Sequence, residues 1–206
     1  MRSWSRVEWL PVDERDDAFG WLAEERMRRT SHALRVDGRV WLIDPLDGAG
    51  LTERVRALGE PAGVLQLLDR HNRDCAVWAS RLGVPVLRVW EGVGEAPFEA
   101  LPVCGNRFWH EVALWEPQTR TLICADVLGT GPIFCAAGER IGVHPVLRLV
   151  PPKSLRHVEP ERVLVGHGAG LHSDATSAVR EALATARRRL PRALFSAARS
   201  GSAASR

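Results

Sequence analysis

The feature that most constrains this chain of 206 residues is a regular alternation of short apolar runs with helix-like stretches between residues 32 and 89. HALRVDGRVWLID contains two apolar alternations around Asp37-Gly38, which is typical of two strands joined by a tight turn. LTERVRALG and RDCAVWASRLG have helical spacing and end at a glycine. GVLQLLD and VPVLRVW between and after them resemble buried strands. This order predicts a layered α/β domain.

The second half of the chain is richer in strand patterns. FEALPVCG, HEVALWEP and RTLICADVLG predict successive strands, with a turn at residues 116–119 between the last two. Residues 130–152 are rich in Gly and Pro and predict a long loop that contains a short helix. RVLVGHGAG predicts a last buried strand, and Asp174 begins an amphipathic helix.

Length and composition indicate one globular domain. Hydrophobic residues make up 45% and charged residues 26% of the sequence, which suits a packed core. We divide the chain into an irregular or short-stranded entry segment (1–30), the main domain (31–195) and a disordered tail (196–206). No apolar stretch suits a signal peptide or a membrane span, so we predict a cytoplasmic protein without a membrane partner.

The charged residues and cysteines exclude several other classes. The net charge is +3, and Lys153 is the only lysine beside many arginines. No nucleic-acid-binding motif accompanies them, so no nucleic-acid partner is predicted and a solvated surface is the favoured explanation. The cysteines form no C-x-x-C pair and are expected to be reduced thiols. Eight Trp and no Tyr leave a homodimer open.

Four segments resemble, in order, the conserved segments of the metallo-β-lactamase superfamily. They are VWLIDP, LLDRHNRDC, RTLICADVLG and RVLVGHGAG, and the resemblance covers residues 31–190. It implies an α/β fold in which two mixed sheets form the centre of an αββα sandwich, with helices on the outer faces. It also implies a metal site at the strand ends.

The family's T-H-x-H-x-D-H signature corresponds to LLDRHNRDC. When the signature is aligned on the Arg-Asp pair, Arg70 and Asn72 replace the first two histidines. Asp74 then matches the signature's aspartate, and Cys75 takes the place of the third histidine. A shift of one residue would bring His71 to a ligand position instead.

The remaining ligand positions follow in the same way. Asn106 or Arg107 stands where the family has its next histidine, Asp126 matches the bridging aspartate, and His167 matches the last histidine. The resemblance therefore implies two sets of residues. The metal ligands are Asp74, Asp126, His167 and Cys75. The residues lining the cleft are Arg70, His71, Asn72, Asn106 and Arg107.

Two functions from different classes remain open. The ligand set is too small for two ions, but one zinc, iron or manganese ion would suit a hydrolase acting on an ester, thioester or phosphoester. Alternatively no ion binds, and Arg70 or Arg73 pairs with Asp126 in its place. The protein would then be a non-catalytic module that holds an anionic small molecule in the former metal cleft. Both functions imply a small-molecule partner.

Overall fold

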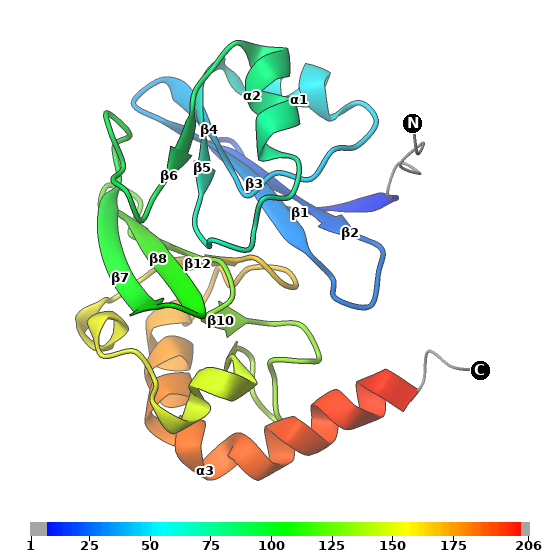
Figure 1. The fold of residues 1–206 in the computed structure, drawn as a ribbon, viewed down its shortest axis with the longest axis vertical. Helices are drawn as coiled ribbons and strands as arrows, with labels where there is room; N and C mark the ends of the chain where they lie inside the picture. The colour runs from blue at the N-terminus through cyan, green and yellow to red at the C-terminus, as the bar shows by residue number, and fades with distance from the viewer. Residues whose placement is uncertain (1–7, 203–206) are drawn as a thin grey trace.

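The computed structural model describes residues 8–202, and residues 1–7 and 203–206 lie outside the described part (Figure 1). A six-stranded sheet forms one half of the centre of the molecule. From edge to edge its strands are β1 (Trp9–Arg15), β2 (Ala18–Ala23), β3 (Thr30–Val36), β4 (Arg39–Ile43), β5 (Glu60–Gln66) and β6 (Val86–Arg88). The strands β1 to β4 pair antiparallel, whereas β4, β5 and β6 are parallel.

A four-stranded sheet forms the other half, in the order β12-β9-β8-β7. Its strands are β7 (Glu99–Asn106), β8 (Trp109–Glu116), β9 (Thr121–Cys124) and β12 (Arg162–Val165). The pair β9 and β12 is parallel, and the other pairs are antiparallel. A two-stranded sheet, β10 (Leu128–Gly129) and β11 (Gly142–Val143), lies between β9 and β12 in the chain.

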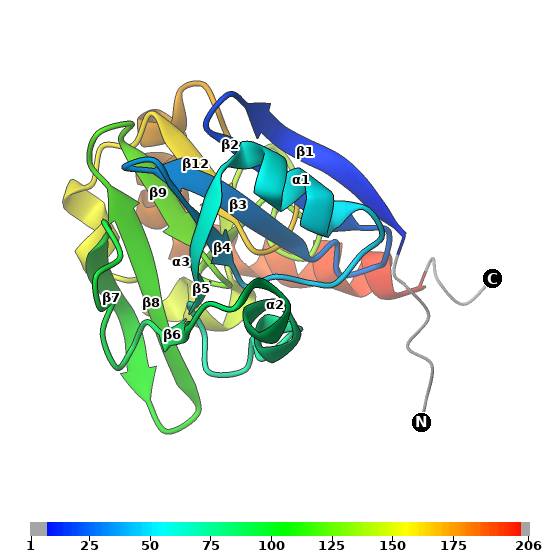
Figure 2. The same ribbon diagram turned by 90° about the horizontal axis from the view of Figure 1, so that it is seen from above.

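The helices lie on the two outer faces of this pair of sheets. They are α1 (Leu51–Leu58), α2 (Cys75–Leu82) and α3 (Ala175–Ser202), together with the short 3-10 helices η1 (Pro145–Leu149) and η2 (Ser154–His157). Figures 1 and 2 show α1 and α2 on one side of the sheets and α3 on the opposite side. The αββα arrangement expected from the sequence is therefore confirmed.

Three clusters of buried apolar residues hold these layers together. Trp41 from the first sheet and Leu114 and Ile123 from the second belong to the cluster between the sheets. A second cluster packs α1 and α2 against the first sheet, and a third packs α3 against the second. Burial of apolar surface on both faces of each sheet explains why the strand patterns in the sequence read as nearly continuous apolar runs.

Regular elements extend into both terminal segments of the chain. The entry segment, where described, contains β1 and β2, and α3 continues past Pro191 through most of the segment predicted as a tail. The predicted turn at Asp37-Gly38 is present, with positive φ angles of 49° and 77°. Within the described part of the chain, no helix is long and apolar enough to span a membrane.

Candidate functional site

The candidate site lies where strands of both sheets end. The strands β4 and β5 are parallel in the first sheet, and β9 and β12 are parallel in the second. Parallel neighbours bring their carboxyl ends to the same edge, so the residues that follow them meet. Asp44 follows β4, and His71 lies in the loop after β5. Asp126 follows β9, and His167 follows β12.

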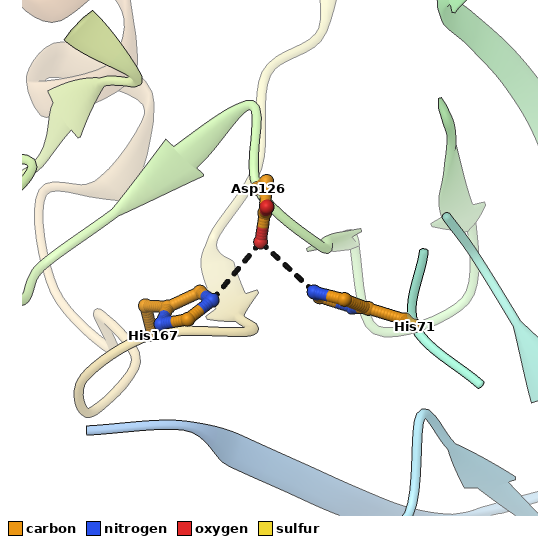
Figure 3. A group of neighbouring side chains, drawn as sticks. All are labelled: His71, Asp126 and His167. Carbon is orange, nitrogen blue, oxygen red and sulfur yellow. Dashed lines mark ion pairs between the residues drawn. The ribbon is translucent and has the colours of Figure 1, made fainter. Parts of the chain in front are cut away.

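Three of these side chains converge on one point (Figure 3). Oδ1 of Asp126 lies 3.1 Å from Nε2 of His71 and 3.0 Å from Nε2 of His167. The three ligand atoms all lie within 4.8 Å of one another. Two imidazole nitrogens and a carboxylate oxygen are suitable ligands for Zn²⁺ or Fe²⁺. Bond lengths of about 2.0–2.2 Å would place the ligands of one ion about 3 Å apart.

The hydrogen bonds of both rings determine which nitrogen faces Asp126. Nδ1 of His71 lies 2.8 Å from Oδ2 of Asp44, and Nδ1 of His167 lies 2.8 Å from the carbonyl oxygen of Met27. Both partners only accept hydrogen bonds, so Nδ1 carries the proton in each neutral ring. Each Nε2 then presents a lone pair to Asp126, as is usual for histidines that bind a metal ion.

Asp126 Oδ1 consequently lies between two ring nitrogens, in a group of three atoms that could hold one cation. The atom is buried and receives no directed hydrogen bond from a described residue, despite its short distances to the two rings. Burial raises the pKa of the Asp126 carboxyl, but contacts with His167 and His71 outweigh it and hold that pKa well below its usual range. The carboxylate is therefore ionised, and the cluster could hold one metal ion.

His71 depends on a buried carboxylate of unusual backbone geometry. Asp44 has a positive φ of 41°, and its Oδ1 accepts a hydrogen bond from the backbone N–H of Leu67 at 3.0 Å. Burial and the charge of Arg73 lower the pKa of His71. Asp44 and Asp126 raise it by more, so the net shift is upward. The strained backbone thus places a negative charge where it orients the ring.

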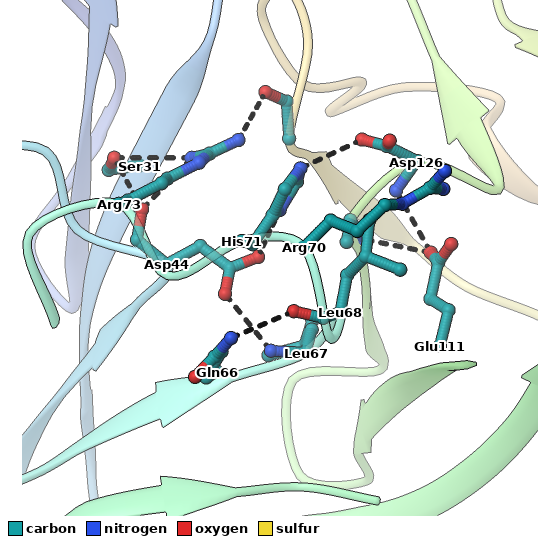
Figure 4. A network of polar contacts seen from close by, with 12 residues as sticks. Ser31, Asp44, Gln66, Leu67, Leu68, Arg70, His71, Arg73, Glu111 and Asp126 are labelled. Carbon is teal, nitrogen blue, oxygen red and sulfur yellow. Dashed lines mark hydrogen bonds and ion pairs between the residues drawn. The ribbon is translucent and has the colours of Figure 1, made fainter. Parts of the chain in front are cut away.

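Arg73 ties the surrounding loops together with its guanidinium group (Figure 4). Nη1 donates to the carbonyl oxygens of Thr30 at 2.6 Å and Asp44 at 2.9 Å, and Nη2 donates to that of Gly166 at 3.2 Å. These carbonyls belong to β3 and to the segments after β4 and β12. Arg73 therefore bonds to backbone around the site and forms no direct ion pair with Asp126, in contrast to the salt bridge considered from the sequence.

Glu111 on β8 shapes the loop that carries Asp126, and the sequence analysis missed it. Its side chain is fully buried, and Oε1 accepts hydrogen bonds from the backbone N–H groups of Ala125, Asp126 and Val127. Oε2 accepts from Nε1 of Trp109 at 2.9 Å. Burial and the charge of Asp126 raise the pKa of Glu111 to about 7. The sequence feature that could have identified Glu111 is a charged residue inside the otherwise apolar strand pattern HEVALWEP.

The two glycines beside His167 permit a close approach of backbones. A side chain on Gly166 would come within 2.6 Å of the carbonyl oxygen of Ala125. Gly168 has a positive φ of 94°, and a side chain there would meet Thr130. The carbonyl of His167 accepts hydrogen bonds from the backbone N–H groups of Thr130 and Gly131. These contacts fix the segment after β12 against the loop after β9.

The structure separates the four residues expected as metal ligands. Asp126 and His167 lie together, and the third member of their group is His71, which we had placed in the cleft. Asp74 is the N-cap residue just before α2, and its Oδ2 accepts a hydrogen bond from the backbone N–H of Asp47 at 2.7 Å. Cys75 is buried on α2 with its thiol near the carbonyl of His71, and burial raises the pKa of this thiol well above its usual range.

The other residues expected in the cleft also lie in different places. Arg70 stacks on the ring of Trp109 with 4.4 Å between its guanidinium carbon and the ring centroid, and among the described residues its ion pair is with Asp69. Asn72 accepts a hydrogen bond from Gln66. Asn106 and Arg107 lie at the exposed turn between β7 and β8.

Comparison with solved structures identifies the fold. The chain is similar to the DIM-1 metallo-β-lactamase exposed to ceftazidime, with 14% identity and a TM-score of 0.54 over 88% of this chain and 100% of that one. It is similar to VMB-1 with 9% identity and a TM-score of 0.55, over 88% and 98% of the two chains. A fragment described as coming from a diflavin flavoprotein of Nostoc sp. PCC 7120 has 12% identity and a TM-score of 0.57, over 91% and 99%.

The chain therefore has the metallo-β-lactamase fold, as its sequence predicted. No family model matches the sequence, and no curated protein is detectably similar to it. Identities this low establish the shared architecture and leave the chemistry to the site itself. At that site the structure has a His-Asp-His group consistent with a partial metal centre.

Proposed function

We propose that this chain is a hydrolase-like protein of the metallo-β-lactamase fold that binds one metal ion through His71, Asp126 and His167. The observation that carries the proposal is the buried Oδ1 of Asp126, which faces two Nε2 atoms and receives no directed hydrogen bond from a described residue. Protons on both Nε2 atoms would require two charged imidazoles in a buried space, whereas one cation satisfies all three atoms.

The protein's own groups support this ligand set. Asp44 and the carbonyl of Met27 keep Nδ1 protonated on the two rings, so that each Nε2 is available as a ligand. Glu111 holds the backbone of the Asp126 loop in place through three N–H groups. When bound, an ion here supplies Lewis acidity, which activates water and polarises a carbonyl or phosphoryl oxygen.

Asp126 is the most exposed of the three ligand residues, so a substrate would approach the site from its side. The side chains of His71 and His167 are 10% and 4% exposed, whereas that of Asp126 is 16% exposed. Arg70 is half-exposed and stacks on Trp109, whose indole donates to Glu111, the residue that binds the backbone of Asp126. A guanidinium group in this position would orient an anionic or carbonyl oxygen of an ester, thioester or phosphoester substrate.

The first test is the metal content of protein purified without chelator or a nickel column, measured by elemental analysis. We expect about one equivalent of zinc, iron or manganese per chain. The variants H71A, D126A and H167A should each lose it. His157 is an exposed histidine on η2, so H157A should retain the ion and serves as the matched control.

Loss of metal from a variant identifies a ligand only if that variant is still folded. Circular dichroism and urea unfolding establish whether it is. Metal-free wild-type protein that also fails to take up added Zn²⁺, Fe²⁺ or Mn²⁺ would refute the proposal. Full metal content in folded H71A would remove His71 from the ligand set.

A second function is favoured by a cavity beside the same loop. A cavity of about 540 Å³ is lined in part by Asn72, Arg73, Arg88 and Val86. Asp74 and Glu91 also line the cavity, and Glu91 pairs with Arg88 at 3.6 Å, so an anionic small molecule would compete with Glu91 for that guanidinium. The occupant of the cavity would not need to reach Asp126. A non-catalytic binding module would bind such anions equally well after D126A, whereas a hydrolase would not turn over substrate in that variant. Anion binding that persists in D126A but is lost in R88Q would favour this second function.

A further inference from the structure

The short helix η1 has its polar and apolar residues in the reverse of the usual arrangement. Its buried residue is Arg148, whose side chain is 0% exposed. Val146 and Leu149 on the same helix are 70% and 59% exposed, and Val150 directly after it is 73% exposed. Residues three apart share a face of a 3-10 helix, so Val146 and Leu149 point to the same side. We call Val146, Leu149 and Val150 the apolar turn.

Arg148 fixes the apolar turn to the body of the protein. Its Nε donates to the carbonyl of Val143 at 3.0 Å, and Nη2 donates to that of Phe134 at 2.7 Å. Nη1 donates to Glu139 at 3.0 Å in a fully buried ion pair. These directed contacts hold η1 in one position. The exposure of the apolar turn is therefore built into the fold, and the turn is a rigid projection.

Basic residues lie on one side of the apolar turn. Arg187 of α3 donates from Nε to the carbonyl of Leu149 at 2.7 Å, which places its guanidinium directly beside the turn. A cavity of about 340 Å³ next to it is lined in part by Pro151, Arg156, Arg180 and Arg187. All three arginines are exposed. We call Arg156, Arg180 and Arg187 the basic rim.

The acidic residues nearby leave the basic rim positively charged. Glu159 forms ion pairs with both Arg180 and Arg120, and Glu181 pairs with Arg189. No partner for the side chain of Arg156 is found among the described residues, and the two Nη atoms of Arg187 are likewise unpaired there. Anionic groups above this surface would meet at least two available guanidinium groups.

We propose that the apolar turn and the basic rim dock onto the surface of an anionic lipid bilayer. Aliphatic side chains on a rigid projection can enter the boundary between headgroups and acyl chains, while flanking arginines bind the phosphates. A second copy fits less well, because a symmetric dimer through this patch would bring its arginines against each other. An acidic protein is also less favoured, since Leu and Val are under-represented among the residues that dominate protein interfaces. This inference does not depend on the metal site.

The docking needs no membrane-spanning segment, although the sequence predicted no membrane partner. The test is co-flotation of the full chain with vesicles of phosphatidylcholine alone and of phosphatidylcholine mixed with phosphatidylserine. We expect binding to the mixed vesicles that weakens with added salt, and a partition coefficient roughly tenfold lower on pure phosphatidylcholine.

Two variants and one control separate the contributions. Replacing Val146, Leu149 and Val150 together by serine should reduce the partition coefficient roughly tenfold on mixed vesicles. The double variant R156Q/R187Q should bind the two kinds of vesicle equally weakly. Phe108 is also 70% exposed but lies in the turn between β7 and β8, so F108S should bind like the wild type.

Three outcomes would overturn the proposal. The first is wild-type protein that does not float with the mixed vesicles. The second is a folded serine variant, as judged by circular dichroism, that binds as well as the wild type. The third is full competition by soluble glycerophosphoserine, since this would indicate a small-molecule site in place of a bilayer-docking surface.

Discussion

Nε2 of His71 lies 3.1 Å from Oδ1 of Asp126, although the two residues follow strands of different sheets. His71 follows β5 in the six-stranded sheet, and Asp126 follows β9 in the four-stranded sheet. Their contact therefore joins the two halves of the molecule at one edge. Substitutions near the strand ends of either sheet should therefore alter metal binding at the site.

Asp44→Asn should weaken metal binding without emptying the site. The variant removes the negative charge from the partner of Nδ1 of His71, and losses of this kind typically cost about 10- to 100-fold in affinity. The affinity is measured by competition with a chromophoric chelator. Asp37→Asn is the matched control, because Asp37 lies in an exposed turn where asparagine is equally suited. Equal affinities in the two variants would show that Asp44 does not support His71.

Asp74→Ala should leave the metal content unchanged. Its carboxylate bonds to the backbone N–H of Asp47, so its removal should lower the free energy of unfolding by about 1 kcal/mol. Elemental analysis and urea unfolding measure the two quantities. Loss of the ion from a folded D74A protein would return Asp74 to the ligand set expected from the sequence alignment.

Arg73→Met should lower the free energy of unfolding by about 3 kcal/mol, because the carbonyls of Thr30, Asp44 and Gly166 all lose a charged donor. Arg73→Lys should retain part of that free energy, since one ammonium group can reach fewer carbonyls than the guanidinium fork. Urea unfolding of the metal-free proteins measures the difference. If the R73K and R73M variants were equally stable, the positive charge of the side chain at position 73 would not be what joins these loops.

Asp13→Asn should lower stability at neutral pH and have little effect in acid. Asp13 is buried on β1 and contacts His32, His172 and the backbone N–H of Gly170. Burial raises the pKa of its carboxyl, but these contacts outweigh it, so the net shift is downward.

A lowered pKa in the folded state contributes stability above the unfolded pKa, about 3.9, and that stability is lost as the pH falls through the folded value. The difference in unfolding free energy between wild type and D13N should therefore be larger at about pH 6 than at about pH 3. Denaturant unfolding at the two values measures it. A difference that does not change with pH would contradict the ionised contact.

Much of the fold could be predicted from the sequence because each layer has its own apolar pattern. The hairpin at Asp37-Gly38, the helices after Gly50 and Asp74, and the strands of the second sheet all lie where their patterns placed them. The alternation of strands and helices also predicted the layered arrangement. Local patterns suffice for the inner strands since these are buried on both faces, whereas the edge strands β1 and β7 are more exposed.

The composition of the site was less predictable. Asp126 and His167 were expected at strand ends and lie there, but the spacing of the Arg-Asp pair drew attention to Asp74 and away from His71. Arg73 adopts a positive φ of 35°, which no spacing rule reveals, and Asp74 after it is the N-cap residue of α2. Glu111 was missed because its partners are backbone N–H groups, which leave no mark on the sequence.

Glu111 also bears on how relatives of this chain could be found. It holds residues 125–127 by their backbone, so the hydrogen bonds themselves place no demand on the side chains of Ala125 and Val127, which are constrained only by their packing in the core. Proline is the exception at these positions, because it has no N–H to donate. A buried acidic residue about fifteen positions before the strand-end aspartate is therefore part of the pattern that builds this site, beside the two histidines. Searches for distant members that begin from the ligands alone would overlook it.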